Sequence, residues 1–202
     1  MIVFLSKISE RMRKRFPAVI KNAAAVTFLG AGVVLSAQLA QAQTAVSSPY
    51  VTRKDIQVAV RAFSFVYGMP EGAIQIEVVY NPNNAASMTE ARELRSIIGS
   101  GRVFAGREVT EKMVTVAQMS TTGSRFAYVT HGLEREYPAL VAEAQSHKML
   151  TFSTDFKCVD SQSCVMGVES APSVNIEISR TAALATGVQF SPALELMVRE
   201  VQ

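Results

Sequence analysis

The spacing of apolar positions after residue 50 predicts alternating helices and strands. At residues 51–66, apolar side chains recur at helical intervals between charged ones, a pattern typical of a helix with one buried face. Residues 73–80 are rich in β-branched and aromatic side chains and predict a buried strand. Ser87 and Glu90 have the spacing of a capping box, so the next helix is expected at 87–98.

The rest of the chain continues in the same way. Strands are predicted at 112–119, 126–130, 149–153, 165–169 and 174–178, and helices at 134–147, 180–186 and 192–198. The last two strands are joined by a short polar turn and predict an antiparallel hairpin. The order of elements predicts a single compact α/β domain with a mostly parallel central sheet, this late hairpin and flanking helices.

The first 42 residues have the pattern of an export signal. The basic residues ahead of the apolar run at 23–39 are Lys7, Arg11, Arg13, Lys14, Arg15 and Lys21. The run ends in the small residues of Ala40-Gln41-Ala42, which a signal peptidase cuts. It is shorter than the roughly 20 residues that span a bilayer, although an uncleaved anchor is the alternative. We expect a signal peptide at 1–42, a short polar tether at 43–50, a domain at 51–202 and a periplasmic mature protein.

The leader also accounts for the basic character of the whole chain. It holds six of the 20 Lys and Arg residues and one of the 17 Asp and Glu residues, which leaves 14 basic and 16 acidic residues after cleavage. These charges are interspersed along the mature chain. The composition therefore favours neither nucleic acid nor an anionic membrane as a partner.

Cys158 and Cys164 suit an oxidising compartment. They flank a polar stretch that is expected to form a turn between two strands, and a disulfide there would close a small loop. A zinc site would need two further ligands, and the two histidines, His131 and His147, belong to other predicted elements. A redox pair usually has two intervening residues rather than five. We expect a structural disulfide.

Motifs of catalysis are absent from the sequence. There is no glycine-rich phosphate loop, no metal-binding histidine pair and no serine nucleophile elbow. A triad could be drawn from Ser153, His131 and Asp155, but nothing in the sequence orients these side chains. We therefore expect no enzyme activity, no cofactor and no metal.

Polar residues follow three of the predicted strands. They are Asn81, Asn83 and Asn84 after the first strand, Thr130 and His131 after the strand at 126–130, and Asp155 after the strand at 149–153. The carboxyl ends of parallel strands meet at one edge, where open α/β sheets bind ligands and helix N-termini can donate N–H groups to an anion. This set is the candidate ligand or partner edge. The alternative is local, with the asparagines forming a turn and the pair at 130–131 capping a helix.

Several segments resemble the YfiR/HmsC-like family of periplasmic regulatory proteins. They are the Phe-Ser-Phe-Val run at 63–66, the cysteine-bounded loop at 158–164, the run VNIEISRTAA at 174–183, and GVQFS at 187–191 with the apolar tail behind it. The order of secondary-structure elements is similar over most of the mature chain, but the amino-acid sequence is similar only in these segments. A second cysteine pair found in some relatives is missing.

The resemblance implies a fold like one lobe of a periplasmic solute-binding protein. It also implies a non-enzymatic role, in which the protein binds the periplasmic domain of an inner-membrane diguanylate cyclase and holds cyclic-di-GMP synthesis down. A homodimer is a further expectation. The alternative function is a single-lobe solute-binding protein that holds a small anion at the candidate edge, with Asn84 and His131 as its main contacts.

Overall fold

The computed structural model describes residues 50–68 and 70–201. All of them belong to one compact unit. The predicted signal peptide and most of the predicted tether lie outside the described residues. Among the described residues, no helix is both long enough and apolar enough to cross a membrane.

The elements alternate between helix and strand, as the sequence predicts. In chain order they are α1 (Arg53–Phe63), β1 (Ile74–Val79), α2 (Ala85–Ile98), β2 (Arg102–Phe104), β3 (Arg107–Val114), the 3-10 turn η1 (Val116–Gln118), β4 (Phe126–Val129), the 3-10 turn η2 (Glu134–Glu136), α3 (Tyr137–Ser146), β5 (Leu150–Ser153), α4 (Phe156–Asp160), β6 (Met166–Glu169), β7 (Asn175–Ser179), α5 (Arg180–Thr186), α6 (Pro192–Glu195) and β8 (Arg199–Val201).

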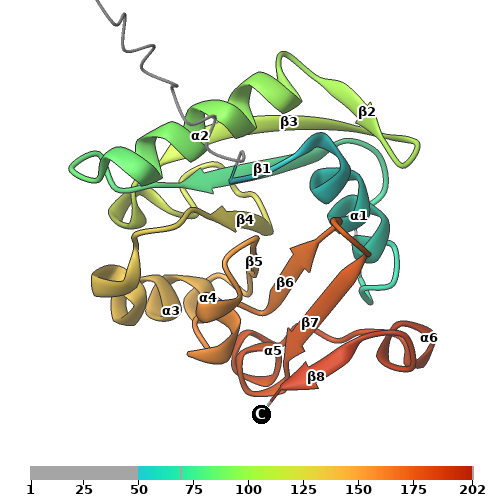
Figure 1. Cartoon of the computed structure of the whole chain (residues 1–202). Coiled ribbons are helices and arrows are strands. Elements are labelled where there is room, and N and C mark those ends of the chain that lie inside the picture. The colour runs from blue at the N-terminus through green and yellow to red at the C-terminus, as the bar shows by residue number, and fades with distance from the viewer. Residues whose placement is uncertain (1–49, 69, 202) are drawn as a thin grey trace, which may run out of the picture. The chain divides into compact units, whose positions relative to one another are not determined.

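All eight described strands form one sheet in the order β2-β3-β1-β4-β5-β6-β7-β8, which Figure 1 shows from top to bottom. The pairs β3-β1, β1-β4, β4-β5, β5-β6 and β7-β8 are parallel. The pairs β2-β3 and β6-β7 are antiparallel, and the second of these is the predicted hairpin. The expected α/β class with a mostly parallel sheet is therefore confirmed.

Helices cover both faces of the sheet and enclose two apolar cores. One core combines α1 and α2 with side chains of β1, β4 and β5, and the aromatic rings of Phe63, Phe126, Phe152 and Tyr128 meet within it. The other core lies under α3 and α4 and includes Leu140 and both cysteines. Strands that are buried on both faces explain the near-continuous apolar runs in the sequence.

Glu77 is a charged residue in the middle of the buried strand β1. Its carboxylate accepts hydrogen bonds from the Ser120 backbone N–H at 2.8 Å and from the Thr122 hydroxyl at 2.5 Å. A buried charge is tolerated when its oxygens are bonded in this way. Glu77 thereby holds the turn between η1 and β4.

Four sequence predictions of local structure are wrong. The helix predicted at 87–98 begins earlier, because Asn84 rather than Ser87 is its N-cap. The strand predicted at 112–119 lies at Arg107–Val114 instead, with η1 after it. The helix predicted at 192–198 ends at Glu195, and the chain then pairs with β7 as β8.

The fourth error concerns the cysteine loop. Residues Phe156–Asp160 form the helix α4, because the side chain of Asp155 caps it by accepting from the Lys157 N–H at 3.1 Å. The turn is confined to the residues after α4, where the Ser163 and Cys164 N–H groups both donate to the Cys158 carbonyl.

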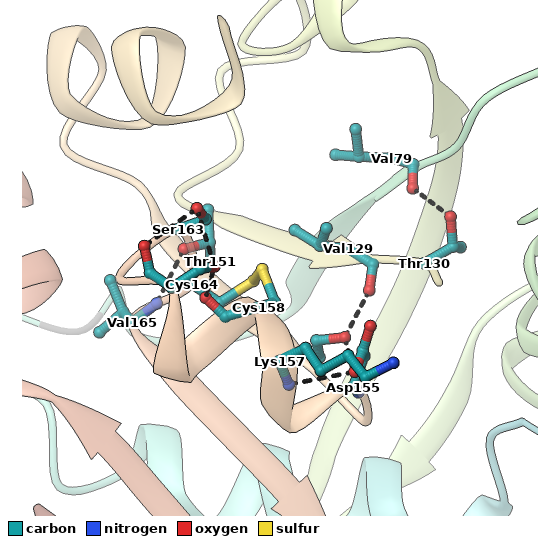
Figure 2. Close-up of a disulfide and its surroundings, with 12 residues drawn as sticks. Val79, Val129, Thr130, Thr151, Asp155, Lys157, Cys158, Ser163, Cys164 and Val165 are labelled. Atoms are coloured by element: carbon teal, nitrogen blue, oxygen red, sulfur yellow. Dashed lines mark hydrogen bonds between the residues drawn. A yellow bond between two sulfur atoms is a disulfide. The ribbon is translucent and has the colours of Figure 1, made fainter. Parts of the chain in front are cut away.

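The predicted disulfide between Cys158 and Cys164 is present, and both cysteines are fully buried (Figure 2). Val165, the next residue, donates its N–H to the hydroxyl of Thr151 at 3.0 Å, which joins the loop to β5. The bridge therefore fixes a short loop against a core that is already well packed.

Replacing both cysteines with alanine should lower the free energy of unfolding by about 2 kcal/mol, since the closed loop is short and its chain entropy is small. Urea denaturation of the oxidised protein and of the Cys158→Ala/Cys164→Ala variant measures this. Thiol labelling in denaturant should label neither cysteine before reduction and both afterwards. Labelling without reduction, or complete unfolding of the variant, would contradict this description.

Candidate functional site

The carboxyl edge of the sheet gathers the polar residues that the sequence singles out. The parallel strands β1, β4 and β5 end side by side, and the loop after each strand carries part of the set. The structure thus brings the loops at 81–84, 130–131 and 155 to one edge, as the strand order predicts. The contacts made by each side chain decide what this edge can do.

Glu90, on α2, lies at the centre of the edge and is fully buried. Its carboxylate accepts from the Tyr128 hydroxyl at 2.5 Å, from the His131 backbone N–H at 2.7 Å and from the His131 ring nitrogen Nδ1 at 2.8 Å. The Thr154 hydroxyl lies 2.8 Å from the Tyr128 hydroxyl and extends the group to the loop after β5. This arrangement of donors suits a charged carboxylate.

The surroundings of Glu90 shift two pKa values. Partial burial of the His131 ring opposes protonation, but the hydrogen bond to Glu90 and its charge outweigh burial, with smaller contributions from Asp155 and Glu134, and the pKa of His131 is raised. Burial, and then the charge of Glu90, raise the pKa of Tyr128 well above its ordinary value. Tyr128 therefore stays protonated and remains a donor to Glu90.

Tyr50, the first described residue of the chain, packs beside His131. The ring of Tyr50 lies 5.2 Å from the His131 ring, and the Tyr50 N–H donates to Glu93 at 3.1 Å. The His131 side chain is 30% exposed. The start of the domain is thus fixed beside the edge.

Thr130 and Ser87 form a second buried pair next to Glu90. Their hydroxyl oxygens are 2.6 Å apart, and Thr130 donates to the Val79 carbonyl at the end of β1. Ser87 accepts from the Asn81 N–H at 2.8 Å. Both hydroxyls therefore hold the ends of β1 and β4 together.

The asparagines shape the loop after β1. Asn84 caps α2 by accepting from the N–H groups of Ala86 and Ser87, and its amide donates to the Gly132 carbonyl at 3.3 Å. Gly132 has a φ of 79°, and a Cβ there would lie 2.3 Å from the Asn84 amide nitrogen. Only glycine fits so close to this cap.

The side chain of Asn81 connects this loop to the start of α3. Its amide donates to the Glu136 carboxylate at 2.6 Å, and its oxygen accepts from the Asn83 N–H at 2.8 Å. The Asn83 side chain is exposed, and it is the member of the asparagine set least involved in internal hydrogen bonds.

Asp155 and Ser153 complete the edge at β5, and Figure 2 shows Asp155 bonded to Lys157 of α4. Ser153 donates its hydroxyl to the Val129 carbonyl at 2.7 Å and accepts from the Asp155 N–H, while Asp155 caps α4. The His131 ring is bonded to Glu90 instead of to Ser153. The structure therefore does not assemble the triad that could be drawn from the sequence.

The local interpretation of the edge is right for the asparagines, which form the turn after β1 and cap α2. It is wrong for Thr130 and His131, because Leu133 and Glu136 are the N-caps of the helical segments after β4. Thr130 bonds to Val79 instead, and His131 to Glu90. Asn81, Asn84, Thr130, His131 and Asp155 each make a hydrogen bond that joins two parts of the fold. Together they link the sheet edge to α2, to the start of α3 and to α4.

Sequence reasoning missed the two carboxylates that organise the edge, Glu90 and Glu136. A signal for Glu90 was available, because it lies four residues before Leu94 and eight before Ile98, both fully buried. That spacing places Glu90 on the buried face of α2. The capping box of Ser87 and Glu90 expected from sequence does not form, because Asn84 is the N-cap of α2 and Glu90 bonds to Tyr128 and His131 instead.

Two hollows lie on the surface, and the first of them borders this network at Asn81, Asn83 and Glu136. One, of about 480 Å³, is beside the loop after β1, and Glu136 and Val116 are among the residues that line it. The other, of about 490 Å³, lies near the carboxyl terminus, and Tyr67 and Leu184 are among its lining residues. Among the described residues, no group of His, Cys, Asp and Glu side chains has the arrangement of a metal site.

No protein-family model matches the chain, and no curated protein matches it. Several solved structures are similar to this chain. A conserved domain protein from Vibrio cholerae O1 biovar El Tor strain N16961 has a TM-score of 0.52 and 14% identity, over 74% of this chain and 60% of that one. The ABC domain in complex with L-Trp from Streptococcus pneumonia has a TM-score of 0.51 and 13% identity, over 73% and 60%.

These likenesses concern the fold. The chain spans about 60% of the length of each of these solved structures. The expectation of a fold like one lobe of a periplasmic binding protein is confirmed.

The raised pKa of His131 predicts how stability depends on pH. Because the folded protein holds this proton more tightly than the unfolded chain does, the stabilisation is complete below the ordinary pKa of 6.5 and is lost as pH rises through the folded-state pKa. As pH rises from below 6.5 through the folded-state pKa of His131, the free energy of unfolding should therefore fall more steeply for the wild type than for His131→Asn. His147→Asn, which changes an exposed histidine, serves as the control and should follow the wild type. Identical pH dependence in the wild type and His131→Asn would contradict the prediction.

Proposed function

We propose that this protein is an exported regulatory protein that acts by contact with another protein and not by turnover. Its partner in this proposal is the periplasmic domain of an inner-membrane diguanylate cyclase, whose activity it holds down. The proposal rests on the predicted leader, on the resemblance to YfiR/HmsC-like proteins and on an exposed apolar surface. The homodimer remains a prediction.

The exposed apolar surface is the observation that carries the proposal. We call it the carboxyl-terminal surface, and its large exposed side chains are Tyr67 (58%), Leu184 (76%), Leu196 (90%) and Met197 (66%). Tyr67 and Leu184 line one hollow together with Glu195, and Leu196 and Met197 directly follow Glu195. Single exposed leucines are ordinary, but a group of large apolar side chains around a hollow is typical of a protein interface.

The apolar tail of the chain divides between core and surface. Leu194 is buried and Val198 packs against the first core, whereas Leu196 and Met197 point to solvent. Packing alone therefore does not explain the whole tail, and contact with a partner would bury the remaining part.

The segments that resemble the family lie next to this surface. Val66 and Phe190 form an antiparallel bridge, the Tyr67 N–H donates to the Gln189 carbonyl, and the Ser191 N–H donates to the Phe65 carbonyl. The runs at 63–66 and 187–191 are thus joined by backbone hydrogen bonds. Their shared position beside the exposed side chains supports a common role in binding.

A solute-binding function receives less support at the predicted edge. The side chains expected to hold a small anion are bonded within the fold, and the carboxylates of Glu90, Glu136 and Asp155 lie among them. One of the similar solved structures is a complex with L-Trp, which keeps ligand binding as a second candidate.

Charged substitutions in the carboxyl-terminal surface should abolish partner binding. Leu184→Glu combined with Leu196→Glu should weaken binding to the periplasmic domain of the cyclase by at least roughly thirtyfold, the effect of losing one interface hot spot. Binding is measured by titrating the purified cyclase domain, and the cyclic-di-GMP content of cells carrying the variant should rise.

Val103→Glu is the matched control. Val103 is 63% exposed but lies on β2, at the opposite edge of the sheet from β8. This variant should bind like the wild type. Absence of binding between the wild type and every diguanylate cyclase of the producing organism would sink the proposal, as would equal losses in the control.

A further inference from the structure

The cleft beside the loop after β1 has the place and size of a small-molecule site. Its volume is about 480 Å³, and small-molecule sites commonly hold roughly 300–1,000 Å³. It is lined by the β1 loop, by η1, by Glu136 at the N-cap of α3 and by the face of α3 that carries Ala139 and Glu143. Ala139 and Glu143 share one side of the helix because their spacing of four matches its turn.

The strand order independently points to this position. From β1 the chain passes through α2 to β3, on one side of β1 in the sheet, whereas from β4 it passes through α3 to β5, on the other side. Strands β1 and β4 are neighbours, so the chain changes direction between them. Ligands of open α/β sheets bind outside the carboxyl ends of the strands at such a point.

Glu136 lines the cleft, and one of its two carboxylate oxygens has no internal hydrogen-bond partner among the described residues. One of its oxygens, Oε1, accepts from the Asn81 amide at 2.6 Å. The other, Oε2, is buried and has no hydrogen-bond partner among the described residues. An unpaired buried carboxylate oxygen is costly, and a bound donor would remove that cost. Asn81 meanwhile fixes the orientation of the carboxylate, so little ordering is needed on binding.

The acidic residues that line the cleft favour a positively charged ligand. No Lys, Arg or His is among the described residues that line it, whereas Glu136 and Glu143 both are. Glu143 is partly exposed and lies 3.6 Å from His147, so Glu136 provides the stronger contact. An anion would meet like charge here, while a cation would be attracted.

The remaining walls are mostly apolar. Val116, Ala117, Leu133 and Pro82 line the cleft opposite or beside the carboxylates. A ligand that fits this lining has an apolar body and one charged donor group. A free amino acid fits less well, because nothing basic in the lining would pair with its carboxylate.

We propose that this cleft binds a small organic cation, a primary ammonium or amidinium compound with an apolar body, at the carboxylate of Glu136. Nothing in this assignment depends on the proposed contact with a cyclase. The cleft is built from η1 and α3, and the carboxyl-terminal surface is built from other elements.

Calorimetric titration of the purified protein with phenethylamine and with benzamidine tests the proposal. At least one of these two cations should bind saturably. Their anionic counterpart, 3-phenylpropanoate, should not bind, and phenylalanine should bind more weakly than phenethylamine. Binding by neither cation, or equal binding of the anion, would overturn the proposal, and this comparison needs no variant.

Glu136→Gln tests the residue assignment. It keeps an oxygen for the Asn81 amide but removes the charge, and it should weaken cation binding by roughly tenfold, as expected for losing one charged hydrogen bond. Glu134→Gln removes an exposed carboxylate two residues away that does not line the cleft, and it should leave binding unchanged. Unchanged binding in Glu136→Gln, or the same loss in both variants, would also overturn the proposal.

The proposed cyclase contact and the proposed amine site can be tested independently of each other. Loss of cyclase binding in the Leu184→Glu/Leu196→Glu variant leaves the amine titration unaffected. Conversely, a Glu136→Gln protein that no longer binds the cation should still bind the cyclase domain when no amine is present.

Discussion

A buried charge holds the functional end of this fold together. Glu90 has no exposed surface, yet it is surrounded by donors from β4, from the loop after β4 and from the loop after β5. Removing the partners of a buried charge typically costs roughly 3–5 kcal/mol. The position of α2 against the sheet, and with it the conformation of the loops at 81–84 and 130–132, therefore depends on this carboxylate remaining satisfied.

That constraint explains why the predicted edge is structural. In an open α/β sheet, polar groups at the carboxyl ends of strands are available for ligands. In this protein Thr130 donates to the Val79 carbonyl, His131 donates to Glu90 and Asn84 donates to the Gly132 carbonyl. What is left for other molecules lies beside the edge. One surface is the cleft at the carboxylate of Glu136, and the other is the carboxyl-terminal surface.

The sequence was sufficient for the fold class, because long apolar runs and turn signals mark β1, β4, β5 and the β6-β7 hairpin without ambiguity. It was not sufficient for short elements that depend on pairing. Strand β8 has three residues and follows a run that has helical character, yet it pairs with β7, and Arg199 lies 3.3 Å from Glu177. Strand β2 is equally short. The disulfide could be predicted from cysteine spacing, but the helix α4, which contains Cys158, could not, since it depends on the Asp155 cap.

The position of the candidate site could be predicted from the sequence, but the hydrogen bonds that its side chains make could not. Strand order places the correct loops at one edge, whereas only the three-dimensional contacts show that Glu90 occupies their donors and that Asn81 leaves one oxygen of Glu136 free. The central claim, that the protein acts through contact at its carboxyl-terminal surface, is tested most directly by site-specific photo-crosslinking in living cells. A photoreactive residue at position 196 should crosslink to a membrane-bound diguanylate cyclase, and one at position 103 should not. A crosslink from neither position, or the same crosslink from both, would contradict the account.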